Sequence, residues 1–164
     1  MKITILTLFP QMFTGVLNSS ILQRAQAKGL VEFEVRYLRD WTLDAHKTVD
    51  DRPYGGGAGM VLKADVVYRA LCEVAKINHK SQNTKHKQIS IAKFKKNERG
   101  GRSSGSEADG GATSAGVNPK IILPTPKGEL FDQKLAIRYS KKSHLVFVCP
   151  HYEGYDERIT SFVT

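Results

Sequence analysis

Apolar and polar positions along the first third of the chain follow the periods of strands and helices. Residues 2–9 are rich in β-branched side chains and alternate in polarity, which predicts a strand, and residues 31–37 predict a second strand. Between them Pro10 can open a helix, and residues 20–28 continue helically until Gly29, a residue typical of the position after a helix. The chain therefore begins as strand, helix, strand.

Residues 39–62 form a long glycine-rich connection, and connections of this length in compact domains are usually functional or disordered. Residues 64–75 then predict a helix, because four apolar side chains recur at helical spacing. These are Val67, Ala70, Leu71 and Val74.

Regular structure resumes late in the chain, with a strand at 120–123, a helix at 132–140 and a fully buried strand at 144–149. Strands that alternate with helices, and late strands that are continuously apolar, are typical of a parallel sheet. The fold class expected is α/β, a mostly parallel sheet with flanking helices.

The segment 77–119 breaks this pattern. It is polar and basic at first and then rich in Gly and Ser, with eight Lys and Arg residues against three Asp and Glu residues. Such a segment buries too little apolar surface to offset its ordering entropy, so we expect a largely disordered insertion. The alternative is that its basic half contacts RNA.

Length and charge narrow the class of protein. A chain of 164 residues suits one domain, and it contains no uninterrupted apolar run of the length of a membrane span. Cys72 and Cys149 lack metal-ligand spacing, so we expect small buried hydrophobes in a cytoplasmic protein. The net charge of +9 favours a polyanionic partner but does not identify one.

The densest motif is His46-Lys-Thr-Val-Asp-Asp-Arg-Pro-Tyr-Gly-Gly-Gly-Ala-Gly-Met60. Its glycines remove Cβ atoms where a backbone bends sharply or lies against another surface. It lacks the spacing of a phosphate-binding loop, so an ordinary glycine turn is the alternative. Two further motifs follow it, Thr125-Pro-Lys-Gly128 and Tyr152-Glu-Gly-Tyr-Asp-Glu-Arg158.

These three motifs, in this order, resemble those of the bacterial tRNA (guanine-N1)-methyltransferases, which belong to the knotted, SPOUT-class methyltransferases. Leu8-Phe-Pro-Gln-Met-Phe13, Arg24-Ala-Gln-Ala-Lys-Gly29 and Leu38-Arg-Asp40 fit the same family, and the likeness covers roughly 1–75 and 120–158. It implies transfer of a methyl group from S-adenosylmethionine to N1 of the guanine 3′ of the anticodon. It also implies a homodimer that binds tRNA rather than DNA or a membrane, and a dependence on Mg²⁺ for which the sequence shows no ligand cluster.

Two loops follow the ends of predicted strands, at 124–128 and 150–156, where open α/β sheets bind ligands, although ordinary turns are the alternative. In the family these loops hold S-adenosylmethionine within a trefoil knot. The resemblance places six cofactor-binding residues there: Thr125, Pro126, Gly128, Pro150, Tyr152 and Gly154. The family usually has Gly where this chain has Pro150, which has no N–H to donate.

The resemblance also implies residues for the reacting centre. Glu153 is the catalytic candidate, acting through the cofactor's ammonium or a bound Mg²⁺, with an exposed loop carboxylate as the alternative. The glycine-rich segment is the candidate substrate or dimer loop, through Asp50, Tyr54, Gly55, Gly56 and Gly57. Residues 156–158 instead suit the start of a helix, because acids are favoured in a first turn.

In the family, the third cofactor loop, the general base and a C-terminal tRNA-binding domain lie beyond the point that matches residue 164. We therefore expect 1–164 to be a truncated cofactor-binding domain with an incomplete knot, inactive alone. One competing interpretation is a non-catalytic RNA-binding protein that keeps the fold. Another is a nucleotide-binding α/β domain of unrelated chemistry.

Overall fold

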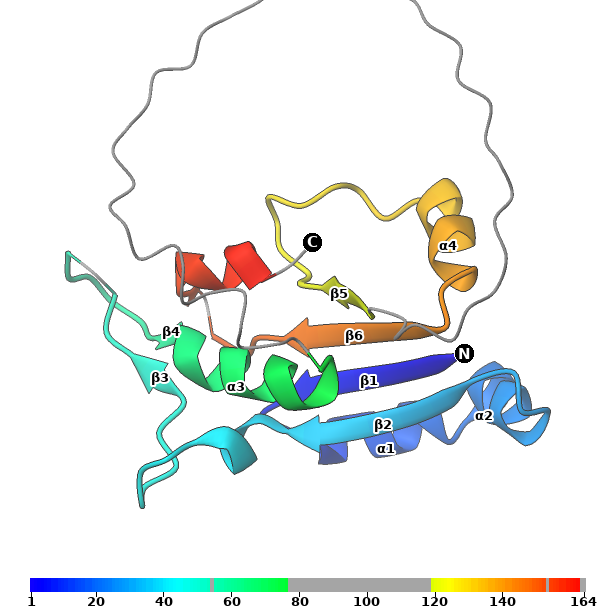
Figure 1. Cartoon of the computed structure of the whole chain (residues 1–164), viewed down its shortest axis with the longest axis horizontal. Helices are drawn as coiled ribbons and strands as arrows, with labels where there is room; N and C mark the ends of the chain where they lie inside the picture. The colour runs from blue at the N-terminus through cyan, green and yellow to red at the C-terminus, as the bar shows by residue number, and fades with distance from the viewer. Residues whose placement is uncertain (54, 77–118, 153, 163–164) are drawn as a thin grey trace, which may run out of the picture. The chain divides into compact units, whose positions relative to one another are not determined.

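The computed structural model describes residues 1–53, 55–76, 119–152 and 154–162. Within them the main sheet has the order β2-β1-β6-β5, formed by β1 (Lys2–Thr7), β2 (Glu32–Tyr37), β5 (Lys120–Ile122) and β6 (His144–Cys149). Every neighbouring pair in it is parallel, so the strands end at one common edge (Figure 1). The predicted α/β fold with a mostly parallel sheet and flanking helices is confirmed.

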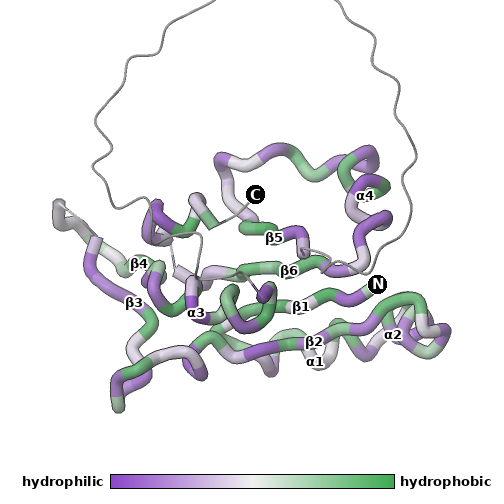
Figure 2. The backbone as a smooth tube through the Cα atoms, viewed as in Figure 1, coloured by the Kyte–Doolittle hydropathy of each residue, from purple (hydrophilic) through white to green (hydrophobic). Residues whose placement is uncertain are grey.

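Helix α3 (Ala64–Val74) covers one face of the sheet. Its buried Val67 and Leu71 belong to the same core cluster as Leu6, Val146 and Val148, which alternate toward that face from the two central strands. Figure 2 shows apolar residues concentrated along these central strands. This layer supplies the hydrophobic core of the described fold.

The opposite face carries α1 (Gln11–Leu17), α2 (Ser20–Ala27) and α4 (Gln133–Ser140). Helix α1 begins directly after Pro10, and Gly29 has a φ of 67°, so both predicted helix boundaries are confirmed. Neither α1 nor α2 buries a side chain. The prediction of a fully buried late strand is wrong, because His144, Phe147 and Cys149 of β6 are half-buried. Cys72 is also half-buried.

A second, smaller sheet was not predicted. The segment 39–62, expected to be one connection, contains β3 (Asp50–Asp51) and β4 (Val61–Leu62), and it begins within a 3₁₀ helix, η1 (Leu38–Trp41). Strand β4 pairs antiparallel with β3 and parallel with β7 (Gly154–Tyr155). Two-residue strands have no period of their own, and their pairing depends on a partner far along the chain.

The C-terminal segment starts a helix, as the acids at 156–158 predicted, but the helix is of the 3₁₀ type, η3 (Glu157–Phe162). Asp156 precedes it and accepts a hydrogen bond from the backbone N–H of Arg158. The Arg158 guanidinium, hydrogen-bonded to Asp156, holds the pKa of that carboxyl below its usual value. Buried Ile159 anchors the helix in the core.

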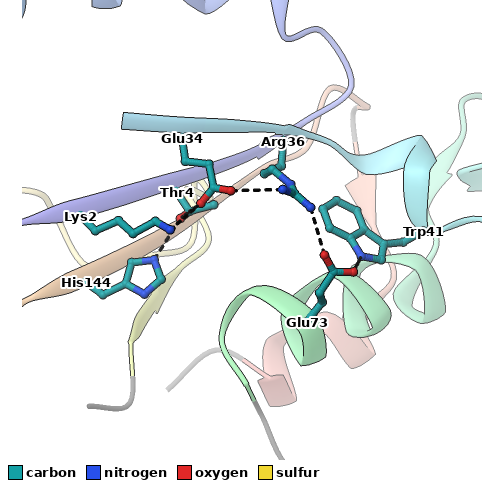
Figure 3. A network of polar contacts seen from close by, with 7 residues as sticks. All are labelled: Lys2, Thr4, Glu34, Arg36, Trp41, Glu73 and His144. Atoms are coloured by element: carbon teal, nitrogen blue, oxygen red, sulfur yellow. Dashed lines mark hydrogen bonds and ion pairs between the residues drawn. The ribbon is translucent and has the colours of Figure 1, made fainter. Parts of the chain in front are cut away.

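A polar network crosses the sheet face beneath α3 (Figure 3). The fully buried Thr4 hydroxyl lies 3.3 Å from Glu34 Oε2 and 3.0 Å from His144 Nε2. A hydrogen bond from Lys2 lowers the pKa of Glu34, whereas burial lowers the pKa of His144. Because these strands are in register, the network joins β2, β1 and β6.

The same network continues to α3 and η1. Arg36 donates to Glu34 at 3.2 Å and to Glu73 of α3 at 3.0 Å, and its guanidinium lies 5.4 Å from the ring centroid of Trp41. The Trp41 indole N–H donates to Glu73 at 2.7 Å. These contacts fix η1 against α3, and η1 carries Arg39 toward Tyr152.

Candidate functional site

The loop after β5 forms one wall of a groove of about 670 Å³. Thr125, Pro126 and Gly128 line it, so three of the six predicted cofactor-binding residues share one hollow. The loop turns through a hydrogen bond of 3.2 Å from the Gly128 N–H to the Thr125 carbonyl. A Cβ at Gly128 would lie 3.3 Å from that carbonyl oxygen, so this tight turn favours glycine.

The rest of the groove is largely apolar, from Leu123 of the loop to Phe131, Tyr139 of α4 and Phe147 of β6. Leu130 is 85% exposed at its rim. A concave site of this volume, with apolar walls and a few loop carbonyls and hydroxyls, is typical of small-molecule binding sites. Its lining suits a flat heterocycle better than a phosphate.

None of the described residues of the loop after β6 lines this groove. Its Gly154 pairs with Val61 in the small sheet, where an added Cβ would lie 3.3 Å from Val61 Cγ1. Tyr152 packs against the core cluster, and Pro150 is half-buried. The structure therefore brings the described part of the 150–156 loop to the small sheet beside the glycine-rich segment, and the predicted Pro150, Tyr152 and Gly154 do not share the groove of the 124–128 loop.

Tyr152 meets two charged groups there. Burial raises the pKa of Tyr152, and the charge and side-chain hydrogen bond of Asp50 raise it further, against the opposing charge of Arg39. Arg39 donates to the Lys47 carbonyl at 2.6 Å. The predicted residues Asp50 and Tyr152 are thus brought together. At neutral pH the Tyr152 hydroxyl stays protonated and can donate a hydrogen bond.

The glycine-rich segment has the backbone that its composition predicts. Gly55, Gly56, Gly57 and Gly59 have φ values of 89°, 80°, 120° and 96°, in the region that L residues rarely adopt. An added Cβ at any of the first three would meet nothing within 4 Å, so the sharp bends, and not close packing within the chain, account for these glycines. The predicted residues Tyr54 and Glu153 lie outside the described residues.

Beside this segment is a polar cleft of about 540 Å³. Gly55 lines it together with cationic and acidic side chains from three places in the chain: Arg52, Lys63, Asp65, Asp156 and Arg158. The cleft joins the glycine-rich segment to the start of α3 and to the 156–158 motif. Of these side chains only Asp156 and Arg158 belong to a predicted feature, the helix start at 156–158.

Sequence reasoning also missed three side chains at the strand ends. Arg39 and Phe9 stand only within motifs of the family likeness, and His151 was not singled out. The structure places Arg39 near Tyr152 and packs the His151 ring against Phe9. Their positions just after β2, β1 and β6 were the available signal, because parallel strands end at one edge.

The described residues contain no group of three His, Cys, Asp or Glu side chains arranged to hold a metal ion. In the same part of the chain, every helix is too short or too polar to cross a bilayer.

A parallel sheet with helices on its faces, and a groove beside the loop that follows β5, places the chain in the α/β class, whose sheets bind ligands beyond the carboxyl ends of their strands. Sequence comparison identifies the family. Residues 1–99 and 106–164 match the model of the family described as tRNA (Guanine-1)-methyltransferase TrmD. The chain belongs to this family.

Curated relatives named tRNA (guanine-N(1)-)-methyltransferase agree with this assignment. The protein from Anoxybacillus flavithermus is 42% identical over 159 residues, and that from Bacillus subtilis is 43% identical over 159 residues. Each alignment covers 97% of this chain and 50% of the relative, so the chain spans about half the length of these relatives.

Among solved structures, the fold is similar to that of the tRNA (m1G37) methyltransferase from Aquifex aeolicus. The TM-score is 0.68 at 28% sequence identity, and the match covers 99% of this chain and 56% of that one. The trefoil knot that the family likeness implies stays a prediction.

Proposed function

We propose that this chain supplies the S-adenosylmethionine-binding part of a cytoplasmic methyltransferase, which acts on N1 of the guanine 3′ of the anticodon in tRNA. The observation that carries the proposal is the family match over residues 1–99 and 106–164. The groove at the 124–128 loop supports it independently, because its size and lining suit the adenosine part of that cofactor.

S-adenosylmethionine, when bound, supplies a methyl group that its sulfonium makes electrophilic. The task left to the protein is alignment and exclusion of water. Thr125, Pro126 and Gly128 are proposed to form the wall against the adenine, through a turn that its own hydrogen bond already fixes. Pro150 can offer only a carbonyl and packing, because proline has no N–H.

The substrate side is proposed to lie at the small sheet. There Asp50 is an acceptor, the protonated Tyr152 hydroxyl is a donor, and Gly55, Gly56 and Gly57 bend the backbone beside them. Glu153 keeps its proposed role at the reacting centre, through the cofactor's ammonium or Mg²⁺, and Tyr54 its place in the substrate or dimer loop. We further propose that the active form is a homodimer.

The direct test is transfer of labelled methyl from S-adenosylmethionine to tRNA by the complete product of the gene. We expect a guanine 3′ of the anticodon to be labelled and an adenine at that position to remain unlabelled. Gly128→Val should sharply weaken cofactor binding, whereas Gly15→Ala, at a helix position with nothing within 4 Å of the added Cβ, should leave it unchanged.

The second candidate is a non-catalytic RNA-binding protein, which the excess of Lys and Arg over Asp and Glu favours. It would bind tRNA but show neither saturable binding of S-adenosylmethionine nor methyl transfer. Retention of tRNA binding without either of these signals would overturn the enzymatic proposal.

A further inference from the structure

Two aromatic rings lie side by side just beyond the carboxyl ends of β1 and β6. Thr7 and Cys149 are register partners at the last positions of these parallel strands, and Phe9 and His151 each follow two residues later. The ring centroids are 4.6 Å apart at an interplanar angle of 67°. This edge-to-face arrangement is a favourable geometry for an aromatic pair.

The pair is both accessible and held in place. Phe9 is 40% exposed and His151 is also exposed. The Phe9 N–H donates to the hydroxyl of buried Thr7 at 3.1 Å, and its carbonyl accepts the N–H of Met12 at 3.1 Å. The backbone is therefore fixed on both sides while the ring faces solvent, so a ligand that stacks on it meets a preorganised surface.

Polar groups continue from this surface. The Tyr152 ring lies 6.0 Å from that of His151, and its hydroxyl leads to Asp50, with Arg39 close enough to oppose the effect of that carboxylate. The hydrogen bond from Arg39 to the carbonyl of Lys47 holds the guanidinium in place. The aromatic pair thus lies at the same sheet edge as a carboxylate acceptor, Asp50, and a cationic donor, Arg39.

We propose that Phe9 and His151 form a stacking platform for an unpaired nucleobase of an RNA loop, with Asp50 and Arg39 beside it to contact polar base edges or a phosphate. The inference rests on the proposed function, which brings an anticodon loop to this sheet edge. Sequence-specific recognition of RNA mostly uses splayed bases stacked on aromatic side chains. The net charge of +9 is complementary to the RNA backbone.

The test measures binding of an anticodon stem-loop RNA to the complete gene product, with 2-aminopurine placed in turn at each loop position. Phe9→Ala and His151→Ala should each weaken binding by about 5- to 150-fold, the effect of losing one base–aromatic stack. Each should also abolish the fluorescence quenching at one loop position. His151→Phe should preserve both signals, and Ile21→Ala, which removes an exposed apolar side chain from α2, should change neither.

Two further measurements separate the possible failures. The salt dependence of binding should keep its slope in Phe9→Ala, because stacking releases no counterions. Thermal unfolding of both alanine variants checks that the fold is intact. Unchanged affinity and quenching in both variants, with methyl transfer by the wild type, would overturn the platform and leave the proposed function standing. If both variants lose the stacking signal but the wild type transfers no methyl group, the platform stands and the proposed function is overturned.

Discussion

Replacing Glu73 by Ala tests whether the polar network holds η1 to the body of the fold. The carboxylate accepts the indole N–H of Trp41 at 2.7 Å and an N–H of Arg36 at 3.0 Å, and Trp41 is only 8% exposed. A hydrogen bond to a charged group contributes about 1.5–3 kcal/mol, and an exposed ion pair adds at most about 1 kcal/mol. The Glu73 side chain is 60% exposed, so water replaces part of both contributions.

We therefore expect Glu73→Ala to lower the free energy of unfolding by about 1–2 kcal/mol, which corresponds to a fall in Tm of about 2–8 °C for a chain of this size. Urea and thermal unfolding measure both quantities. The matched control is Glu129→Ala, which removes a carboxylate that is 71% exposed and paired with an exposed arginine at 3.3 Å. Glu129→Ala should lower the free energy of unfolding by less than about 0.5 kcal/mol.

A double-mutant cycle with Trp41→Phe isolates the indole hydrogen bond, because phenylalanine keeps most of the ring and removes the N–H. The coupling free energy should be about 1 kcal/mol. Equal effects of Glu73→Ala and Glu129→Ala, or a coupling near zero, would refute the reasoning that this carboxylate fixes η1.

Asp132→Ala removes the side-chain cap of α4, in which Asp132 Oδ1 accepts the Leu135 N–H at 2.8 Å. It should lower the free energy of unfolding in urea by about 1 kcal/mol, whereas Asp132→Asn should lower it little. Gly154→Val should strain the small sheet by about 1–3 kcal/mol, because even its Cβ would lie 3.3 Å from Val61 Cγ1; unchanged hydrogen exchange of the amides paired there would contradict this. Burial lowers the pKa of His144 below its ordinary value of 6.5, so the unfolded chain takes up that proton first. The contribution of His144 to the free energy of unfolding should be fully present above pH 6.5 and should be lost as the pH drops toward the folded-state pKa. Urea unfolding at several pH values should show a shallower decline in His144→Gln.

Most of the main sheet could be predicted because its elements carry a local signal. β1 and β2 show strand periodicity, and α3 places Val67 and Leu71 on one face. The small sheet could not be predicted in this way, since β3, β4 and β7 have two residues each and are defined only by pairing across the fold. Sequence pattern describes which face a segment buries, but it does not describe which distant segment it meets.

The same division applies to the candidate site. The rule that parallel sheets bind ligands beyond their carboxyl ends pointed to two loops, 124–128 and 150–156, with ordinary turns as the alternative. The structure places residues of the first loop along a groove. The approach of Asp50 to Tyr152 depends instead on the pairing of β4 with β7. Phe9 and His151 carried no pattern of their own, and only the register of β1 against β6 brings their rings together.

The pairing of β1 with β6 has a consequence for synthesis of the chain. Thr4 on β1 and His144 on β6 contact each other across 140 residues, and β1 lies between β6 and β2 at the centre of the sheet. At about 5–20 residues per second, the first strand leaves the ribosome roughly 7–28 s before its partner has been made. During that interval β1 can pair only with β2, and its other edge is open to chaperones or to other nascent chains.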